Sequence, residues 1–351
     1  MSLRKLGLVL LCLSLVTVAV AGCGQQAAPP KEEKKATPAP APATKPAAKP
    51  GWPTKMSIGA GSAGGGMFMA ASAIAAALQK ALPELGTTVE ITGAAVENSQ
   101  LLQAKQVEMG LITSEVAWEA FSGKYTFEGK PCTALRTIFP GYKSVNVFVV
   151  LSNSGINKLT DLNGKIVSPG TKNSANEVFA TRVIEVAGIK PKGMQAMRTP
   201  DATAALQAKQ IDCYQVGIPN STTSELDFSV SGGVKLLFLE GDIAKKFAEK
   251  YPQYLQMTLE KGALKNVTQD VKHFGSYVSF FVNESSPEDL VYAIVKACYE
   301  KREEIIKNSN IELYKGMDLA NIGMTTVPYH KGAIKYFQEK GIKVPDNLIP
   351  Q

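Results

Sequence analysis

Short apolar runs alternate with longer amphipathic runs along most of the chain. The short runs predict strands, and the runs in which apolar residues recur every three or four positions predict helices. The predicted strands include 89–91, 107–112, 145–151, 234–239 and 277–282, and the predicted helices include 98–104, 116–121, 175–187, 242–251 and 288–307. Strands that alternate with helices are typical of a parallel, doubly wound α/β sheet.

The stretch Met56–Leu78 begins with a short apolar run, continues through several glycines and ends in an alanine-rich segment. This order predicts a strand, a tight loop and the start of a helix. The loop exposes backbone N–H groups, and the helix dipole adds partial positive charge at the same place. The stretch is therefore a candidate site for an anion.

One segment of the chain is repeated. Leu102–Glu108 (LQAKQVE) reappears as Leu206–Asp212 (LQAKQID), each time at the end of a predicted helix and before a short strand. The matched context favours two lobes of similar construction, whose polar loops at the carboxyl ends of strands face one cleft. We expect lobe 1 to comprise residues 54–147 and 241–351, and lobe 2 to comprise 148–240. Two hinge crossings would then let the lobes close around a ligand.

The N-terminal part of the chain has the pattern of an export signal and a tether. A positive start precedes an apolar run of signal-peptide length that ends in Val20-Ala21-Gly22-Cys23. This ending resembles a bacterial lipobox, so we predict a lipoprotein signal peptide over 1–22 and lipidation of Cys23; a simple secretory signal and an uncleaved anchor are the alternatives. The Ala/Pro/Lys-rich segment within 23–53 predicts an extended stalk. We therefore expect an extracytoplasmic protein that is anchored to a bacterial membrane by lipid.

Composition narrows the classes of partner. The chain is 45% hydrophobic and 20% charged, with a formal net charge of +7 that is spread along the sequence. No basic tract is interleaved with aromatic residues, so nucleic-acid binding is not predicted. A modest basic excess suits a small anionic ligand or an anionic membrane surface.

The cysteines outside the signal and the lipobox are Cys132, Cys213 and Cys298, which are far apart in the sequence. They form no C-x-x-C pair and show no metal-ligand spacing, so we expect neither metal nor redox chemistry. Buried free thiols and one long-range disulfide are both compatible with the spacing.

An enzyme is the main alternative class. Gly59-x-Gly61-x-x-Gly64 matches the dinucleotide-binding fingerprint, but no acidic residue stands about 20 positions later to bind a ribose. Ser62 lies in G-S-A rather than in a nucleophile motif, and the two histidines, His273 and His330, have ordinary surroundings. Four carboxylates lie near loop ends, and we interpret them as helix caps or solvated side chains: Glu97, Glu115, Glu177 and Asp201. We expect no enzyme and no cofactor; an exported dinucleotide-binding or other enzyme stays as the alternative.

Several short motifs together resemble those of the TAXI family, the extracytoplasmic solute-binding subunits of tripartite ATP-independent periplasmic (TRAP) transporters. They are 58–65 (IGAGSAGG), 96–98 (VEN), 108–117 (EMGLITSEVA), 159–165 (LTDLNGK), 217–220 (GIPN) and 328–333 (PYHKGA). The resemblance covers roughly residues 55–345. It implies a type II periplasmic-binding-protein fold and capture of a small carboxylate, such as glutamate, glutamine or the dicarboxylate 2-oxoglutarate. It also implies delivery to a fused membrane permease that an ion gradient drives.

On this resemblance we expect a monomer that clamps its ligand between the lobes. Lobe 1 would contribute Ser62, Gly65, Gly66, Asn98, Ser114 and Glu115, and lobe 2 would contribute Thr171, Lys172, Asn173, Ser174 and Asn220. Glu115 would take a ligand amino group, although family members often have Asp there. Lys172 and Asn173 stand where a Ser-Gly pair is common. Lys172 either adds a cation for the ligand or points to solvent.

Overall fold

The computed structural model describes residues 49–219, 233–262, 267–308 and 317–351, and every structural statement below concerns these residues. Within these ranges, no helix has the length and apolar character needed to cross a bilayer. The predicted signal peptide, Cys23 and Asn220 lie outside the described residues.

The strands form one mixed sheet in the order β2-β1-β3-β10-β4-β7-β5-β6, with β8 paired to β4 and β9 paired to β10. Their bounds are β1 Ser57–Gly59, β2 Thr88–Glu90, β3 Met109–Thr113, β4 Leu135–Leu151, β5 Ile166–Ser168, β6 Gly193–Met194, β7 Cys213–Pro219, β8 Val234–Leu237, β9 Leu255–Leu259 and β10 Val271–Asn283. At one end of the sheet β1 pairs in parallel with β2 and β3, and at the other end β5 pairs in parallel with β6 and β7.

Helices cover both faces of this sheet. Their bounds are α1 Gly66–Ala81, α2 Ala95–Gln103, α3 Ser114–Ser122, α4 Ala175–Val186, α5 Thr199–Gln207, α6 Gly241–Lys250, α7 Glu288–Glu300, α8 Arg302–Asn308 and α9 Lys331–Glu339. A short turn of 3₁₀ helix, Tyr125–Phe127, follows α3.

The apolar cores group these elements into two lobes. Residues of β1, α1, α7, α8 and α9 share one core, and α2, α3 and β3 contribute to a second core at the same end of the sheet; we call this end the first lobe. At the other end, α4, α6 and β5 share one core, and α5 and β7 share another; we call this end the second lobe. Burial of apolar surface on both faces of each half-sheet is the main stabilising term of such a fold.

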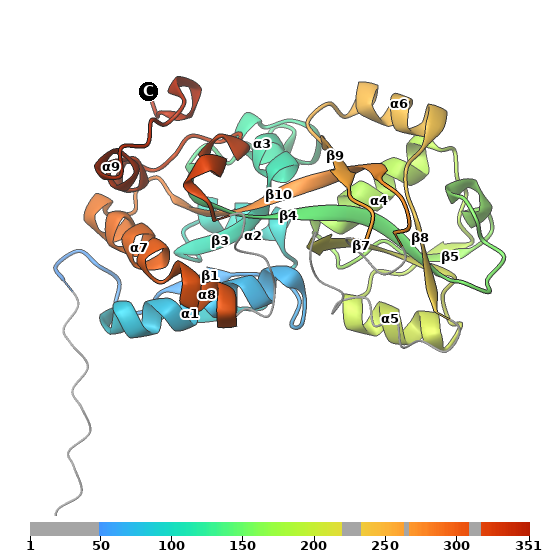
Figure 1. Cartoon of the computed structure of the whole chain (residues 1–351), viewed down its shortest axis with the longest axis horizontal. Helices are drawn as coiled ribbons and strands as arrows, with labels where there is room; N and C mark the ends of the chain where they lie inside the picture. Colours follow the sequence, from blue (N-terminus) through green and yellow to red (C-terminus); the bar gives the residue numbers. More distant parts are fainter. Residues whose placement is uncertain (1–48, 220–232, 263–266, 309–316) are drawn as a thin grey trace, which may run out of the picture. The chain divides into compact units, whose positions relative to one another are not determined.

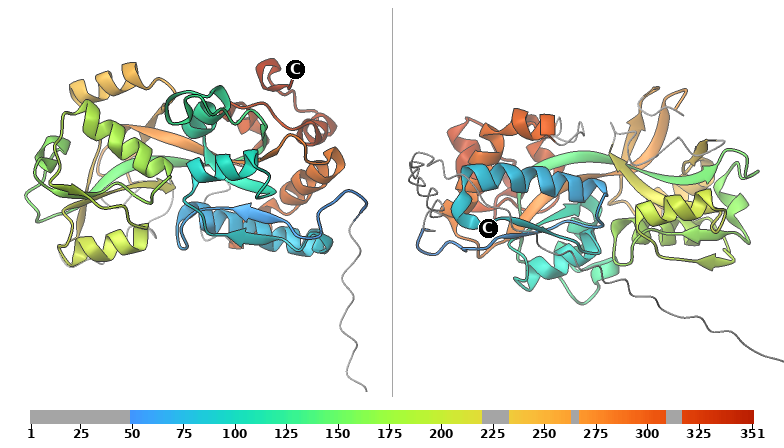
Figure 2. Two further views of the ribbon diagram at one scale, coloured as in Figure 1. Left: turned by 180° about the vertical axis from the view of Figure 1, so that it is seen from behind. Right: turned by 90° about the horizontal axis from the view of Figure 1, so that it is seen from below.

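Two long antiparallel strands connect the lobes. Strands β4 and β10 pair from Gly275 opposite Val145 to Asn283 opposite Leu135. Figure 1 shows them side by side, running from the half with α1 and α7 to the half with α4 and α5, and Figure 2 shows the same connection from behind and from below. Backbone bending in these two strands would therefore change how the lobes face each other.

The packing of α6 bears on where the chain returns to the first lobe. Phe247 of α6 and Tyr251, which follows it, pack in the core of the second lobe, together with Phe274 near the start of β10. Residue 241, where lobe 1 was expected to resume, is thus still part of a segment that packs with the second lobe. We propose that the crossing back falls within β10, near Gly275.

The doubly wound α/β character predicted from the pattern is confirmed, with two differences in the elements. Strand β4 begins at Leu135, whereas the sequence predicts its start at 145, because Pro140 and Gly141 interrupt the apolar run. The pairing with β10 shifts register at this point, so a β-bulge accommodates both residues. The predicted helix 288–307 is split at Lys301 into α7 and α8.

The two copies of the repeated segment have the same backbone conformation. Lys105, two residues after α2, has φ 57°, and Lys209, two residues after α5, has φ 56°, both in the left-handed region. In each copy the next residue donates its N–H back to the helix, from Gln106 to the carbonyl of Leu101 and from Gln210 to that of Ala205, at 2.8 Å in both. The repeat therefore encodes one way of ending a helix before a strand.

Candidate ligand-binding site

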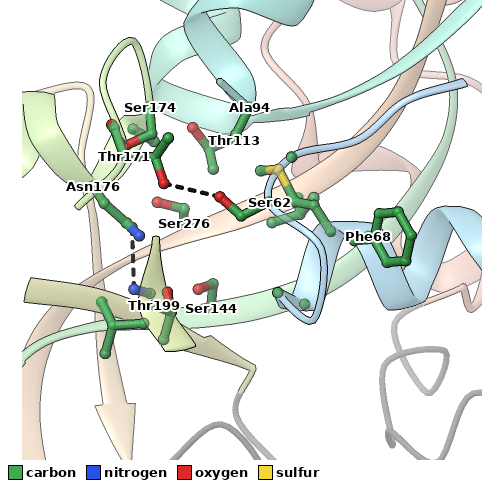
Figure 3. Close-up of a pocket in the computed structure, with 18 of the residues that line it drawn as sticks. Ser62, Phe68, Ala94, Thr113, Ser144, Thr171, Ser174, Asn176, Thr199 and Ser276 are labelled. Carbon is green, nitrogen blue, oxygen red and sulfur yellow. Dashed lines mark hydrogen bonds between the residues drawn. The ribbon is translucent and has the colours of Figure 1, made fainter. Parts of the chain in front are cut away.

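A pocket of about 80 Å³ lies between the two lobes and is lined by both of them and by the connecting strands (Figure 3). Its polar lining residues are Ser62, Thr113, Tyr142, Ser144, Asn146, Thr171, Ser174, Asn176, Thr199 and Ser276. The remaining lining residues are Gly61, Gly65, Gly66, Met67, Phe68, Ala94, Ala175, Val216, Gly217 and Val278. All of these described lining residues are uncharged.

The first-lobe wall is the glycine-rich loop between β1 and α1. Gly65 precedes the first turn of α1 in an extended conformation, and no side chain caps the helix there. The first N–H groups of a helix have no partner within the helix. The Gly65 N–H donates to the Ser62 carbonyl at 3.0 Å, so a ligand is the natural acceptor for the donors that begin at Gly66.

The second-lobe wall is the loop from Gly170 to Ser174 that leads into α4. Ser174 caps α4, because its Oγ accepts a hydrogen bond from Glu177 N at 3.2 Å. Thr171 Oγ1 lies 2.9 Å from Ser62 Oγ, so one hydrogen bond joins the two walls across the pocket (Figure 3). This contact shows the lobes close together around the pocket.

The connecting strands form the floor of the pocket. Ser144 and Asn146 of β4 occupy alternate positions and so share one face of the strand. The Asn146 side chain is 6% exposed, and its Nδ2 donates no hydrogen bond among the described residues. A buried donor without a partner is costly, which points to an acceptor supplied by a ligand.

Gly217 leaves room for this floor. A Cβ at this position would lie 2.9 Å from Ser144 Oγ, 3.2 Å from Asn176 Oδ1 and 3.4 Å from Asn146 Oδ1. The Gly217 N–H itself donates to Asn176 Oδ1 at 3.1 Å (Figure 3). A side chain at position 217 would therefore fill the space between these polar groups.

The N-terminal ends of α1 to α5 all contribute to the lining. For α1, α4 and α5 the lining residue is the first of the helix, namely Gly66, Ala175 and Thr199. For α2 and α3 it is the residue just before the helix, namely Ala94 and Thr113. Each helix end carries partial positive charge, and together these ends favour a negatively charged ligand. The pocket can therefore hold an anion without a cationic side chain in its lining.

The structure brings part of the predicted site together. Ser62, Gly65, Gly66, Thr171 and Ser174 line the pocket. The predicted residues Asn98, Ser114, Glu115, Lys172 and Asn173 are not among its lining residues.

Asn98 ties strand ends together beneath the pocket. Its Nδ2 lies within hydrogen-bonding distance of three carbonyl oxygens, those of Gly59 and Ala60 at 3.1 Å and that of Leu111 at 2.8 Å. Its Oδ1 accepts from Thr92 Oγ1 at 2.7 Å. The side chain is fully buried, so its polar atoms are used within the first lobe.

Ser114 and Glu115 lie behind the first-lobe wall. Ser114 Oγ accepts the N–H of Tyr277 in β10 at 3.1 Å. Glu115 is the second residue of α3 and is 1% exposed. Neither side chain faces a ligand in the pocket directly.

Lys172 and Asn173 belong to the rim, where the lobes meet. A Cβ at Gly93 would lie 2.7 Å from the carbonyl oxygen of Lys172 and 3.4 Å from Cβ of Asn173. Asn173 has φ 61°, and its N–H donates to the Glu177 carboxylate at 2.7 Å. The main chain at these two residues therefore closes over the first lobe.

The sequence interpretation missed seven polar lining residues: Thr113, Tyr142, Ser144, Asn146, Asn176, Thr199 and Ser276. Ser144 and Asn146 interrupt an apolar run at every second position, and this is the signal that would have revealed them. Asn176 and Ser276 carry no comparable signal, because one follows a helix start and the other lies inside a long strand.

The cysteines and histidines of the described residues do not form a second candidate site. Cys132, Cys213 and Cys298 are free and buried, and burial raises the pKa of the Cys132 thiol to about 11. His330 caps α9 by accepting from Gly332 N at 3.2 Å, and burial lowers the pKa of this histidine and of His273. In the described part of the chain, no cluster of three or more His, Cys, Asp or Glu residues is placed to hold a metal ion.

Comparison with solved structures defines the class of fold. The periplasmic binding protein BugD is 15% identical, with a TM-score of 0.51 over 84% of this chain and 99% of BugD. A substrate-binding protein of an amino acid ABC transporter is 17% identical over 74% of this chain and 99% of its own, with a TM-score of 0.43. A putative L-cystine ABC transporter protein from Listeria monocytogenes is 14% identical over 75% and 96%, with a TM-score of 0.46. The likeness to BugD shows the fold of a type II periplasmic binding protein, as predicted.

The sequence profile of the NMT1-like family matches residues 58–341, which is most of the chain. The protein belongs to the NMT1-like family.

Proposed function

We propose that the protein is the solute-binding component of a TAXI-type TRAP transporter and captures a small carboxylate, such as glutamate, glutamine or 2-oxoglutarate. The observation that carries this proposal is the interlobe pocket itself. It is uncharged among the described residues, it faces several helix N-termini, and it contains the unpartnered amide of Asn146. These are the features that would hold a carboxylate in place of water.

The two walls would hold the ligand by different donors. The first lobe offers the Ser62 hydroxyl and the N–H of Gly66, and the second lobe offers the Thr171 hydroxyl; the Gly65 N–H is already bonded to the Ser62 carbonyl. Hydrogen bonds to an ionised acceptor are about twice as strong as neutral ones. A carboxylate between the walls would therefore favour the closed arrangement over the open one.

The size of the pocket supports a compact ligand. One water needs about 10–15 Å³ of such space, so the cavity of about 80 Å³ has room for several water-sized groups. This volume suits a small organic acid better than a peptide or a nucleotide.

Closure of the lobes would also prepare the protein to deliver its ligand to the permease. The hydrogen bond between Ser62 and Thr171 and the rim contact at Gly93 join the lobes, and the resulting closed surface is what a fused TRAP permease would recognise. We further propose that lipidation at Cys23 and the stalk over 23–53 hold the monomer near that permease, on the extracytoplasmic side. The support for the permease and the anchor is the sequence pattern described above.

A ligand panel tests the proposal. Thermal-shift measurements with amino acids, monocarboxylates and dicarboxylates should reveal at least one stabilising carboxylate, and calorimetry should give one-to-one binding. Ser62→Val should weaken that binding about tenfold with little loss of stability, because it removes one charge-assisted hydrogen bond worth about 1.4 kcal/mol.

Ser152→Val is the matched control, since Ser152 is an exposed serine outside the pocket lining. It should leave affinity unchanged. If the full panel produced no binding to any carboxylate, the proposed ligand class would be wrong. If Ser62→Val bound as well as the wild type, Ser62 would not belong to the site. No observation on the described residues favours an exported enzyme.

A further inference from the structure

A carboxyl group without a counter-ion is buried directly behind the pocket. Glu115 is 1% exposed, and its Oε1 makes no hydrogen bond among the described residues. Its Oε2 accepts a long hydrogen bond from Ser114 Oγ at 3.5 Å, and the hydroxyls of Thr113 and Ser276 lie near the carboxyl group. An ionised carboxylate is costly in such surroundings unless it is paired or well hydrogen-bonded.

The neighbouring cation already has a partner. Both terminal nitrogens of Arg182 in α4 donate to the carboxylate of Glu119 in α3, with Nη2 at 2.9 Å from Oε2. The guanidinium also donates to Tyr254 Oη at 3.1 Å, and it lies over the ring of Tyr251 at 4.6 Å. The guanidinium is thus paired with Glu119.

The groups that face Glu115 come from every element packed around it. Glu119 lies one turn further along α3, Tyr254 precedes β9, and Ser276 belongs to β10. Burial raises the pKa of Glu115, the charge of Glu119 raises it further, and the hydroxyls of Thr113 and Ser276 lower it by less. Burial therefore favours the protonated form of Glu115 in this closed arrangement.

Side chains of both lobes lie around the pair Glu115 and Glu119, with Tyr254 near Glu115 and Arg182 on Glu119. Glu115 and Glu119 belong to the first lobe, whereas Arg182 and Tyr254 belong to α4 and to the core of the second lobe. Thr113 and Ser276, which separate Glu115 from the pocket, line the pocket themselves. Separation of the lobes would withdraw the covering side chains and let water reach the carboxyl group, where its ordinary pKa is about 4.3.

We propose that closure of the two lobes takes up one proton from solvent at the Glu115 carboxylate, so that ligand capture is linked to pH. The proposal rests on the proposed function in one respect, namely that the lobes close on a ligand. The sign follows from linkage. The closed form holds one more proton than the open form, so a rise in pH disfavours closure and a fall in pH favours it.

The first test needs no ligand. Ser62 Oγ and Thr171 Oγ1 lie 2.9 Å apart, so Ser62→Cys/Thr171→Cys should form a disulfide that holds the lobes closed. Carboxyl ¹³C NMR, with the Glu115 signal assigned by its loss in Glu115→Gln, then follows the titration in the oxidised and reduced forms. We expect Glu115 to titrate at clearly higher pH in the oxidised form. Equal titration in both forms, or titration near the ordinary value in both, would overturn the proposal.

The second test uses 2-oxoglutarate and L-glutamate as probes. Calorimetry in two buffers with different heats of ionisation gives the number of protons taken up on binding. We expect about one proton for the wild type and none for Glu115→Gln, with wild-type affinity falling about tenfold per pH unit and the variant nearly flat. Glu128→Gln is the control, because Glu128 is exposed, and it should behave like the wild type.

The two tests separate the possible failures. Binding without proton uptake in the wild type would contradict the proton link while leaving carboxylate capture intact. Absence of binding by both probes would count against the proposed ligand class, and the NMR titration of the cross-linked protein would still decide the proton link. If Glu115→Gln does not fold, the wild-type calorimetry gives the proton number by itself.

Discussion

The two walls of the pocket have the same plan but start their helices differently. In each, a strand ends, a glycine-containing loop follows and a helix begins at the pocket. In the second lobe, Ser174 satisfies the first turn of α4 through its side chain. In the first lobe, Gly65 stands at the same point before α1 and provides no side-chain cap. The glycine wall therefore keeps backbone donors free for a ligand, whereas the serine wall has used one of them.

The lobes also differ in how they tie strands together beneath the pocket. In the first lobe, Asn98 of α2 reaches three carbonyl oxygens of β1, the following loop and β3. The corresponding position in the second copy of the repeat is Ala202, which is also buried but apolar. There, Asn176 of α4 makes the tie instead, through one bond to Gly217 N. A similar backbone thus uses an asparagine from a different helix in each lobe.

The largest expected effect is on the free energy of unfolding, when the side-chain hydrogen bonds of Asn98 or Asn176 are removed. Asn98→Ala leaves buried carbonyl groups without their donor and should lower the free energy of unfolding by about 3 kcal/mol. Asn176→Ala removes the acceptor of one N–H beside the pocket, where water can replace it, and should cost about 1 kcal/mol. Urea denaturation of both variants measures the difference. Equal losses would show that the two ties are equivalent.

The rim where the walls meet should give the next largest effect. A Cβ at Gly93 would lie 2.7 Å from the Lys172 carbonyl oxygen, and overpacking of this kind costs about 1–3 kcal/mol. The same Cβ would lie 2.6 Å from Glu97 Oε2, but that side chain can rotate away, whereas the Lys172 carbonyl is backbone and meets the Cβ only when the lobes are closed. Gly93→Ala should therefore weaken ligand affinity about thirtyfold and lower the unfolding midpoint only slightly. Calorimetry and thermal denaturation measure the two quantities. A lower midpoint with normal affinity would contradict this interpretation of the rim.

The uncapped start of α1 can be tested with a matched pair of variants. Gly65→Ser introduces a hydroxyl that can cap α1 and compete with a ligand for its N–H groups, whereas Gly65→Ala adds a Cβ alone. The same Cβ would approach the Ser62 carbonyl oxygen at 3.2 Å in both variants, so that strain cancels in the comparison. We expect Gly65→Ser to bind a carboxylate about tenfold more weakly than Gly65→Ala. Equal affinities would remove the helix start from the site.

The smallest expected effect is that of Lys172→Ala. The Lys172 side chain is exposed and is not part of the described lining, and it is the backbone carbonyl that meets Gly93. Removal of the side chain should change affinity by less than about twofold, or ~0.4 kcal/mol. A loss of tenfold or more, measured by calorimetry, would restore Lys172 as a ligand-binding cation.

The sequence predicted much of the architecture because its strongest signals are local. The glycine run after β1 and the repeated LQAKQ segment each determine a short piece of backbone, and both pieces have the expected form. The start of β4 was missed because Pro140 and Gly141 disrupt the pattern of a strand that only its pairing with β10 sustains. Long-range pairing of this kind is not encoded in local periodicity.

The candidate site was less predictable, since it depends on which polar groups find partners within the protein. Asn98 and Asn146 are both buried asparagines, yet Asn98 uses its donors on backbone carbonyls and Asn146 leaves its Nδ2 unpaired beside the pocket. Nothing in the neighbouring residues distinguishes the two. Their roles follow from the distance to a carbonyl group in another strand.

Gly217→Ala offers the most direct test of the central claim, which is that a small carboxylate binds in the interlobe pocket. The added methyl group would stand among Ser144, Asn146 and Asn176, at 2.9–3.4 Å from their side-chain oxygens. Calorimetric titration of the best-binding carboxylate into wild type and variant should show one-to-one binding that the substitution weakens at least tenfold, while the folded structure is retained by circular dichroism. Equal affinity of the two proteins would contradict the account.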